Sequence, residues 1–266
     1  MPTPRAVEAD ETAPPRTART AVVWSVLREV AARGGSVQPG APVQPGPPVL
    51  DVLDVGGGTG GFAVPLAGLG HRVTVVDPSP DALAALQRRA GEAGVAVRAV
   101  QGDAVDLLDV VAASSADLVL CHGVLEHVDD PRGVAPSLDA LVAVLRPGGT
   151  LSLLVASRNA VVLARAVAGR FGEARAALAD PDGRWGPGDP LPRRFTEPGL
   201  VALLESAGLQ VEQVHGVRTV ADLVPGALVD AEPGAAEALV DLEVATAHLP
   251  EFRALATQLH VRATRR

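Results

Sequence analysis

Short apolar runs rich in valine and leucine alternate with longer amphipathic stretches over residues 49–155 of this 266-residue chain. The runs have the length of buried strands, and helical spacing is found in the intervals 62–69, 80–93, 105–112 and 133–145. Because strands joined by helical crossovers pair in parallel, this alternation predicts an α/β fold, with a mostly parallel sheet and helices on both faces. In such a sheet, ligands bind at the carboxyl ends of the strands.

The segments on either side of this alternation differ from it. Residues 1–16 lack periodicity and are expected to form a mobile tail, whereas residues 17–33 have apolar positions at helical spacing and predict a helix. Proline and glycine punctuate residues 34–48, which predicts a loop. One helix and a stretch rich in Asp, Gly and Pro fill residues 156–195, which predicts a substrate lid inserted after the fifth strand. Alternation returns in residues 196–266, with helices predicted over 197–208 and 235–247 and strands over 211–218 and 258–264.

Composition narrows the class of protein. Hydrophobic residues make up 47% of the chain, enough for a full core, and we expect a single domain over residues 17–266. The sole cysteine, Cys121, excludes an internal disulfide. No apolar stretch approaches the roughly 20 residues of a membrane span, and no signal-peptide pattern begins the chain. These features predict a cytoplasmic protein without membrane contact.

A glycine loop follows the first predicted strand and is the strongest sign of a ligand site. The loop is Gly56-Gly57-Gly58-Thr59-Gly60, and Asp77 ends the next apolar run. Glycine permits positive φ and close backbone approach, and an acid on the neighbouring strand can accept both hydroxyls of a ribose. The spacing Gly56-x-Gly58-x-x-Gly61 fits a dinucleotide site, and Gly56-x-Gly58-x-Gly60 fits methyltransferases that use S-adenosylmethionine. The glycines alone do not decide between a dinucleotide site and an S-adenosylmethionine site, and a purely structural role for them is a third possibility.

Further polar residues follow the later strands in the same order. Asp103 follows the third run, where it could accept the exocyclic amine of an adenine, and His122 ends the fourth. Leu145-Arg146-Pro147-Gly148-Gly149 then gives a helix stop and a turn before the fifth. This ordered set resembles a class I methyltransferase. The resemblance implies a Rossmann-like fold with a seven-stranded sheet and S-adenosylmethionine as the methyl donor, with S-adenosylhomocysteine as the product.

A closer resemblance extends over nearly the whole chain beyond residue 16. The chain resembles the bacterial tRNA wobble-uridine methyltransferases that esterify 5-carboxymethoxyuridine. The motifs that carry this resemblance, besides the glycine loop, are Ala18-Arg19-Thr20-Ala21-Val22-Val23-Trp24, Cys121-His122-Gly123-Val124-Leu125-Glu126-His127-Val128, Val167-Ala168-Gly169-Arg170-Phe171, Gly216-Val217-Arg218, Leu242-Glu243 and His260-Val261-Arg262-Ala263-Thr264.

The resemblance implies a set of donor-binding residues. Together with the neighbouring positions of the same motifs, the candidates are Arg19, Asp54, Gly56, Gly57, Gly58, Gly60, Asp77, Pro78, Asp103, Ala104 and His122. Arg19 could pair with the carboxylate of the donor, and His122 would lie beside its methionine part. The alternatives are an ordinary surface arginine on an amphipathic helix for Arg19 and a satisfied buried histidine for His122.

Methyl transfer from a sulfonium requires that acceptor and methyl group be held in line, without covalent catalysis by the protein. A carboxylate acceptor is already ionised and needs a cation to place it, for which Arg158, Arg194 and Arg218 are the candidates. Each of the three has a solvated surface charge as its alternative. His122, Glu126 and His127 fall within six residues, without the usual spread of a catalytic zinc site, so we expect no metal.

The charge pattern leaves the acceptor open. The chain has a net charge of −8, but residues 158–194 contain seven arginines against Glu173, Asp180, Asp182 and Asp189. This local excess fits a tRNA anticodon loop without requiring one, and Trp185 and Phe195 could stack on unpaired bases or anchor the lid to the core. Three hypotheses therefore remain: a tRNA carboxyl methyltransferase, a small-molecule O- or N-methyltransferase, and a non-catalytic module that binds S-adenosylmethionine.

Overall fold

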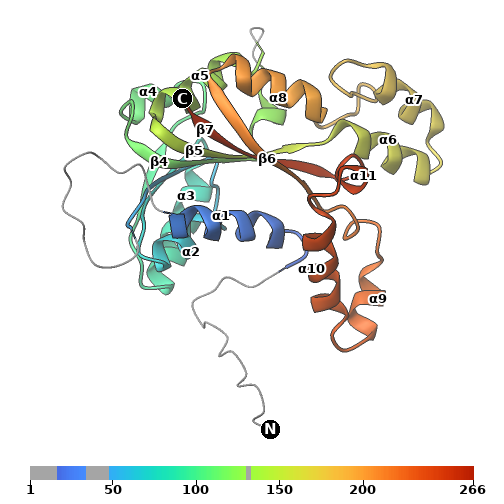
Figure 1. Cartoon of the computed structure of the whole chain (residues 1–266), viewed down its shortest axis with the longest axis horizontal. Coiled ribbons are helices and arrows are strands. Elements are labelled where there is room, and N and C mark those ends of the chain that lie inside the picture. Colours follow the sequence, from blue (N-terminus) through green and yellow to red (C-terminus); the bar gives the residue numbers. More distant parts are fainter. Residues whose placement is uncertain (1–16, 34–47, 130–132) are drawn as a thin grey trace.

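A single seven-stranded sheet forms the centre of the molecule (Figure 1). The computed structural model describes residues 17–33, 48–129 and 133–266, so the predicted tail and nearly all of the predicted loop over 34–48 lie outside the described residues. The strands are β1 (Asp51–Val55), β2 (Arg72–Asp77), β3 (Val97–Gln101), β4 (Ala116–His122), β5 (Leu145–Ala156), β6 (Leu209–Val217) and β7 (Gln258–Arg265), in the spatial order β3-β2-β1-β4-β5-β7-β6.

Six of these seven strands run in the same direction. The pairs of β1 with β2 and β4, of β2 with β3 and of β4 with β5 are parallel, and β7 is antiparallel to both β5 and β6. The prediction of a mostly parallel sheet is confirmed. The carboxyl ends of β1 to β6 therefore meet at one edge, where the polar residues that follow the strands come together.

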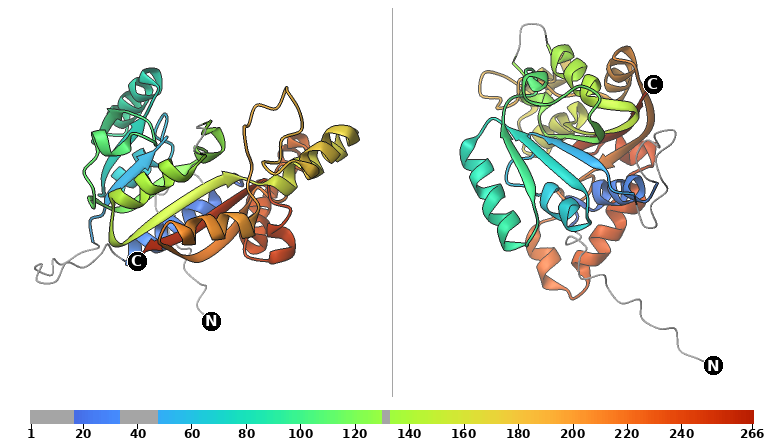
Figure 2. Two further views of the ribbon diagram at one scale, coloured as in Figure 1. Left: turned by 90° about the horizontal axis from the view of Figure 1, so that it is seen from above. Right: turned by 90° about the vertical axis from the view of Figure 1, so that its left-hand side faces the viewer.

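Helices cover both faces of the sheet (Figure 2). One face packs against α1 (Ala21–Arg33), α2 (Ala63–Gly68) and α3 (Pro80–Glu92), and the other against α4 (Leu107–Val110), α5 (Ala135–Val144) and α8 (Glu197–Ser206). Each helix turns an apolar stripe to the sheet, such as Leu83, Leu86 and Ala90 on α3. In the described part of the chain, no helix combines the length and the hydropathy needed to cross a membrane.

The Pro-Gly-Gly sequence predicted as a turn before the fifth strand lies inside that strand. The ladder between β4 and β5 skips from Ala116–Leu145 to Leu118–Thr150, so the intervening residues form a bulge. Gly148 has a φ of +75°, and a Cβ on Gly149 would lie 2.9 Å from the carbonyl oxygen of Arg146. Glycine is needed at both positions because the strand bends there.

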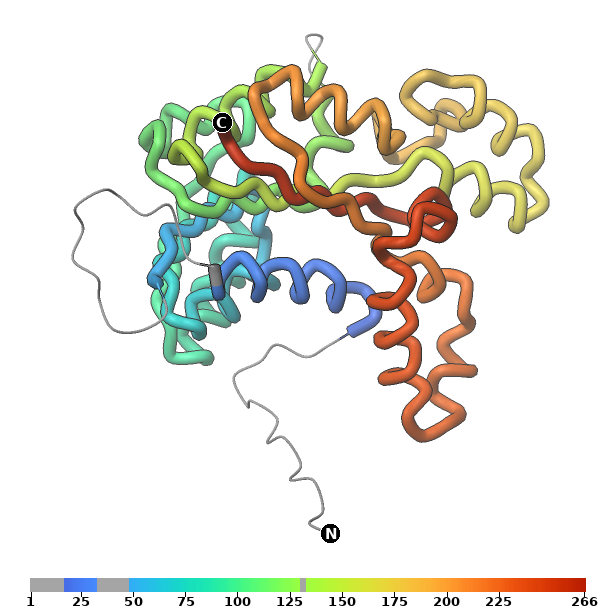
Figure 3. The backbone as a smooth tube through the Cα atoms, viewed as in Figure 1, coloured from blue at the N-terminus to red at the C-terminus, as the bar shows by residue number. Residues whose placement is uncertain are grey.

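The segment between β5 and α8 contains two helices, so the prediction of one was wrong. After β5 the chain forms α6 (Arg158–Val167), turns at Gly169 with a φ of +74°, forms α7 (Phe171–Ala179) and continues without regular structure to Phe195. We call residues 157–195 the inserted segment. It extends from one end of the sheet beside the tube of α8 (Figure 3). Its role as a lid stays a prediction.

Three further helices complete the C-terminal part. They are α9 (Gly226–Ala231), α10 (Ala235–Thr246) and α11 (Pro250–Arg253), and a single 3-10 turn, η1 (Leu125–His127), follows β4. The sequence predicted α10 but not the short α9, which has no buried residue and hence no apolar stripe to detect. Helices α9 and α10 project beside α1, on the opposite side of the sheet from α8 (Figure 3).

Candidate functional site

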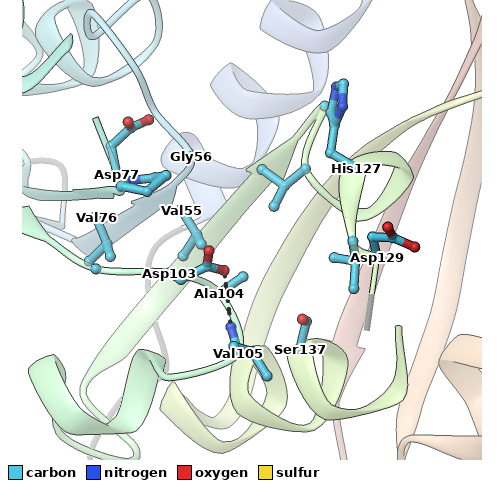
Figure 4. Close-up of a pocket in the computed structure, with 15 residues that line it drawn as sticks. Val55, Gly56, Val76, Asp77, Asp103, Ala104, Val105, His127, Asp129 and Ser137 are labelled. Carbon is cyan, nitrogen blue, oxygen red and sulfur yellow. Dashed lines mark hydrogen bonds between the residues drawn. The ribbon is translucent and has the colours of Figure 1, made fainter. Parts of the chain in front are cut away.

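A cavity of about 560 Å³ opens at the carboxyl ends of the central strands (Figure 4). Residues that follow β1, β2, β3 and β4 form its wall, and α5 contributes Ser137. The lining residues are Val55, Gly56, Val76, Asp77, Pro78, Gly102, Asp103, Ala104, Val105, Gly123, Val124, His127, Val128, Asp129 and Ser137. Of the predicted donor-binding residues, five therefore share one cavity: Gly56, Asp77, Pro78, Asp103 and Ala104.

The glycine loop brings backbone close to this cavity. Gly56, Gly58 and Gly60 have φ values of +71°, +54° and +81°, which side-chain-bearing residues rarely adopt. A Cβ on Gly56 would lie 2.3 Å from Cγ2 of Val124, which lines the cavity. Larger residues here would fill the space between the loop and the end of β4, so the loop forms a cradle that only glycine leaves open.

Asp77 is held in place by the backbone on both sides of its carboxylate. Oδ2 accepts from the Gly58 N–H at 2.9 Å, and Oδ1 accepts from the Ser79 N–H at 2.9 Å. The residue is 7% exposed and lines the cavity. A carboxylate has about four lone-pair sites, so two remain for a ligand while the other two fix its orientation. The carboxylate is thus arranged in advance to accept hydroxyl protons.

Asp54 lies behind the glycine loop, outside the cavity lining. It is 2% exposed, and a Cβ on Gly57 would lie 2.6 Å from its Oδ2. Burial, together with the negative charge of Asp77, raises the pKa of Asp54 to about 7. A positive charge bound near the loop would favour the ionised carboxylate.

Asp103 and Ala104 follow β3, the strand that pairs with β2, and line the same cavity as Asp77. The Val105 N–H donates to Oδ1 of Asp103 at 3.4 Å, which is drawn as a dashed line in Figure 4. Ser137 of α5 also lines the cavity and was not predicted. It is only 1% exposed, and its Oγ has no hydrogen-bond partner among the described residues. No signal in the sequence could have found it, because it lies within an ordinary helical pattern.

His122 and Arg19 do not line the cavity. The His122 ring packs edge-on against Phe62, with ring centroids 4.9 Å apart, and Phe62 lies 5.1 Å from Trp24 of α1. His122 Nε2 is 2.9 Å from Oγ of Ser152, and burial lowers its pKa to about 3. The imidazole is therefore neutral at physiological pH. Arg19 is exposed on the turn before α1.

Arg194 is fully engaged inside the inserted segment. Its guanidinium donates to both carboxylate oxygens of Asp189 at 2.7 Å and to the Gly183 carbonyl at 3.0 Å. Its side chain is 7% exposed, and that of Asp189 is 0% exposed. Because this forked pair is buried, the geometry argues against Arg194 as an acceptor-binding cation and for a tether of the loop between α7 and α8.

The other two predicted arginines are partly engaged. Arg158 donates to the Leu178 carbonyl at 2.6 Å and so joins the start of α6 to the end of α7. Arg218 follows β6 with a φ of +60° and pairs with Asp222 at 2.7 Å, and its side chain is 27% exposed. The guanidinium of Arg218 can therefore exchange partners at modest cost, because the pair is accessible to water.

Arg193 was not predicted as a site residue and contacts the chain after β4. Its Nη1 is 3.7 Å from where a Cβ on Gly133 would lie, so the side chain reaches from the inserted segment towards the loop after β4. Within residues 17–33, 48–129 and 133–266, Arg193 forms no ion pair, and its buried Nε has no partner. Only the long-range fold brings residues 133 and 193 together, so no pattern in the sequence predicts this contact.

Comparisons with known proteins agree on the class. A family model described as "Methyltransferase domain" matches residues 52–149. The tRNA 5-carboxymethoxyuridine methyltransferase of Escherichia coli (strain K12) is 32% identical over 248 residues, covering 92% of this chain and 87% of that protein. A ubiquinone biosynthesis O-methyltransferase of Xanthomonas axonopodis pv. citri (strain 306) is 36% identical over 167 residues, 62% of this chain and 65% of that protein. The structure of an S-adenosylmethionine dependent methyltransferase from Mesorhizobium loti has a TM-score of 0.57 at 21% identity, covering 92% of this chain and 98% of that chain.

Proposed function

This chain belongs to the S-adenosylmethionine-dependent methyltransferases, and we propose that its acceptor is the carboxylate of 5-carboxymethoxyuridine in tRNA. One observation carries the choice of acceptor. The relative with that printed activity matches 92% of this chain, whereas the O-methyltransferase relative matches 62%. Substrate specificity in this fold depends on such additions to the shared donor-binding half.

The cavity fits the donor. A Cβ at Gly56 would fill the space beside the loop, so glycine lets a ligand approach the backbone closely there. Asp77 has two lone-pair sites for the ribose hydroxyls. Asp103 and Ala104, which follow β3, face the adenine in this proposal, with the Asp103 carboxylate accepting from its exocyclic amine. Pro78 and Val124 supply apolar contact with the ring.

Asp54 supplies charge complementarity behind the loop. The donor carries a sulfonium and an ammonium, and a cation near Asp54 lowers the raised pKa of that carboxyl. Donor binding then releases a proton from Asp54 at pH values below about 7. Gly57 keeps the carboxyl close to the loop because a side chain there would collide with it.

Catalysis in this proposal is a matter of position. When bound, the donor supplies a methyl group whose bond to sulfur breaks, with the electron pair leaving on sulfur, as a carboxylate oxygen forms the new bond. The protein holds the two groups in line and excludes water, which is worth effective molarities of roughly 10⁵ to 10⁸ M. An ionised carboxylate loses no proton in the transfer, so no general base is needed.

We propose Arg193 and Arg218 as the cations that place the acceptor. Arg193 extends from the inserted segment towards Gly133 with an unpartnered Nε, and Arg218 is held at the end of β6 by a partly exposed pair. Arg158 remains a weaker candidate because its guanidinium already joins α6 to α7. Arg194 supports them indirectly, since its pair with Asp189 fixes the loop that carries Arg193.

The inserted segment supports an RNA acceptor. Arg170 and Arg175 are exposed around Phe171, whose side chain is 71% exposed at the start of α7. Nearby, the Arg165 guanidinium stacks on the ring of Trp185 at 4.0 Å. Exposed arginines beside an exposed aromatic ring match the contacts that hold unpaired nucleotides, namely phosphate pairing and base stacking.

The test is transfer of label from S-adenosylmethionine by the purified full-length chain to total tRNA and, separately, to a small-molecule extract. We expect alkali-labile label in tRNA, because a methyl ester hydrolyses in base. Arg193→Gln and Arg218→Gln should each reduce that label by about tenfold or more, from the loss of one charge-assisted contact. Arg98→Gln, an exposed arginine on β3 away from the rim, is the matched control and should transfer normally. Label in small molecules alone would assign the acceptor to metabolites instead.

A further inference from the structure

A second cavity, of about 430 Å³, lies in the inserted segment. Its wall is formed by α7 and by the loop that follows α7, and the lining residues are Ala176, Asp180, Arg184, Trp185, Gly186 and Pro187. None of these residues lines the donor cavity at the glycine loop. The volume falls within the roughly 300–1,000 Å³ that is typical of small-ligand pockets. The donor and its methyl group leave this second cavity unused.

The Trp185 indole gives the second cavity an aromatic surface. The guanidinium of Arg165 covers one face of the ring, with Cζ 4.0 Å from the ring centroid, and Arg165 does not line the cavity. A Cβ on Gly188 would lie 3.2 Å from Cη2 of the indole and 3.5 Å from Cζ3, so Gly188 lies against that edge. The face opposite Arg165 is the large surface of Trp185 that is left to line the cavity.

The position of Arg165 restricts what that face can bind. The face of an indole attracts cations through its negative quadrupole, and one guanidinium already lies against this ring. A second cation on the opposite face would be repelled by the first. A flat neutral ring meets no such repulsion, and stacking on tryptophan holds unpaired nucleobases of any sequence. The ring therefore favours a nucleobase over an ammonium ligand.

Two polar side chains lie beside the ring in the same lining. Arg184 is exposed, and its guanidinium forms no ion pair within the described part of the chain. Oδ1 of Asp180 accepts from the backbone N–H groups of Asp182 at 2.8 Å and Arg184 at 3.1 Å, which leaves Oδ2 for a ligand. A guanidinium can pair with a phosphate, and a carboxylate can accept from the exocyclic amine of a base.

Hydrogen bonds within the loop hold these groups in place before a ligand binds. The Trp185 backbone N–H donates to Oδ2 of Asp189 at 3.0 Å, and the same carboxylate forms the buried forked pair with Arg194. Arg194 in turn donates to the Gly183 carbonyl at 3.0 Å. A loop fixed in this way loses little conformational entropy when it binds.

We propose that the second cavity binds an unpaired base of the RNA, stacked on Trp185, with its exocyclic amine donating to Asp180 and a neighbouring phosphate paired with Arg184. The inference rests on the proposed RNA acceptor and adds recognition of a base other than the methylated one. Uracil has no exocyclic amine, so the acceptor uridine itself does not satisfy Asp180. The second cavity thus reads a neighbour of the acceptor, away from the reacting atoms.

Binding of an anticodon stem-loop by the full-length chain, measured by fluorescence anisotropy, tests the site. Ala176→Phe adds a ring at an exposed position of the cavity wall and should weaken binding about tenfold, because the ring occupies the space of the base. Ala179→Phe makes the same addition at an exposed position of α7 outside the lining and should bind normally. Trp185→Leu should weaken binding about tenfold, and Trp185→Phe, which keeps an aromatic ring, should retain most of the affinity.

Stem-loops with one base removed identify the bound position. Loss of one loop base other than the acceptor should weaken binding to the wild type about tenfold and leave binding to Ala176→Phe unchanged, because that variant has already lost the contact. Removing only the exocyclic amine of this base should weaken binding to the wild type but not to Asp180→Asn. Equal binding by Ala176→Phe and Ala179→Phe, or a uracil at the identified position, would overturn the inference.

Failure of the proposed function gives a different result. The wild type would then bind no stem-loop at any salt concentration and would transfer label to small molecules alone. A wild type that binds and methylates the RNA, with no difference between the two phenylalanine variants, would leave the proposed function intact and remove only the base-binding role of the second cavity.

Discussion

At the scale of single residues, Asp77 joins the glycine loop to the cavity. Its carboxylate accepts from Gly58 and Ser79, so the loop and the side chain fix each other. This explains why the spacing from glycine loop to acid was informative in the sequence. Both features belong to consecutive strands, and a local pattern suffices to bring them together.

Asp77→Ala should weaken S-adenosylmethionine binding by about 10- to 100-fold, because hydrogen bonds to a charged group are worth about 1.5–3 kcal/mol. Isothermal titration calorimetry measures this loss. Asp81→Ala removes an exposed acid from the first turn of α3 and should bind the donor normally. Unchanged affinity in Asp77→Ala would remove Asp77 from the donor site.

Asp54→Asn should stabilise the ligand-free protein more at pH 8 than at pH 5. A carboxyl whose pKa is raised from 3.8 to about 7 on folding binds its proton more tightly in the folded state. Its favourable contribution is thus present at low pH and is lost as pH rises from 3.8 through about 7. The Asn variant has no charge to bury, so its Tm advantage should grow by roughly 5 °C between these pH values. A constant difference in thermal melts would contradict this burial cost.

At the scale of elements, Glu243 of α10 organises the turn after β6. It is 0% exposed, and its carboxylate accepts from the backbone N–H groups of Thr219, Val220 and Ala221 at 2.7 to 3.0 Å. The turn begins at Arg218, whose left-handed backbone this clamp supports. One buried acid therefore determines where a proposed acceptor contact lies.

Glu243→Gln should lower the free energy of unfolding by about 1–3 kcal/mol, because an amide presents one acceptor oxygen to three N–H donors. Urea denaturation measures the loss. Glu237→Gln changes an exposed acid on the same helix and should leave stability within experimental error. Equal stability of the two variants would show that the clamp is not needed.

Arg194→Met should loosen the loop between α7 and α8, because it leaves the buried Asp189 without its partner. Breaking one side of a buried pair costs about 3–5 kcal/mol. Limited trypsin digestion should then cut faster after the exposed Arg184. The double change Arg194→Met with Asp189→Leu removes both charges and should recover part of the resistance. Resistance unchanged in the single variant would contradict a tether.

Sequence patterns predicted the elements well where each buried an apolar stripe. The helical intervals of the donor-binding half became α2, α3, α4 and α5, with ends that moved by a few residues. Two helices were missed: the single helix predicted before Asp180 is divided at Gly169 into α6 and α7, and the short α9 has no buried residue that would mark it. The bulge in β5 was missed because Pro-Gly-Gly usually ends a strand, and only the skipped ladder reveals that β5 continues through it.

At the scale of the whole molecule, positive charge is separated from negative charge. The chain has a net charge of −8, yet its inserted segment has seven arginines against four acids over residues 158–194. Such a distribution attracts a polyanion to one end and repels it elsewhere. The salt dependence of binding can therefore distinguish an RNA acceptor from a small-molecule acceptor.

Binding of an anticodon stem-loop should fall steeply with salt, and Arg175→Ala should reduce the slope of log affinity against log salt by about 1. Phe171→Ala should weaken binding by about tenfold at every salt concentration, through lost stacking. Electrophoretic mobility shifts over a salt series separate the two effects. Arg98→Ala, on β3, should change neither. Salt-independent binding would argue for a small acceptor.

The meeting of five predicted residues in one cavity could be predicted from the sequence, whereas the contact between Arg193 and the position of Gly133 could not. Gly56, Asp77 and Asp103 follow consecutive strands, so their meeting is a consequence of topology, and the family resemblance that they supported is confirmed. Arg193 meets Gly133 across 60 positions of sequence through the irregular part of the inserted segment. No period or motif encodes that contact, which arises only when the whole chain has folded.

The positions of the two tryptophans determine what the fluorescence of this protein reports. The chain has two tryptophans and no tyrosine: Trp24 lies against Phe62 near His122, and Trp185 lies under Arg165 in the inserted segment. Ultraviolet emission of the protein therefore comes from two reporters, one on α1 against Phe62 and one in the inserted segment. A Trp24→Phe chain would emit only from the inserted segment, so its spectrum would record in real time whether that segment moves when donor or RNA is added.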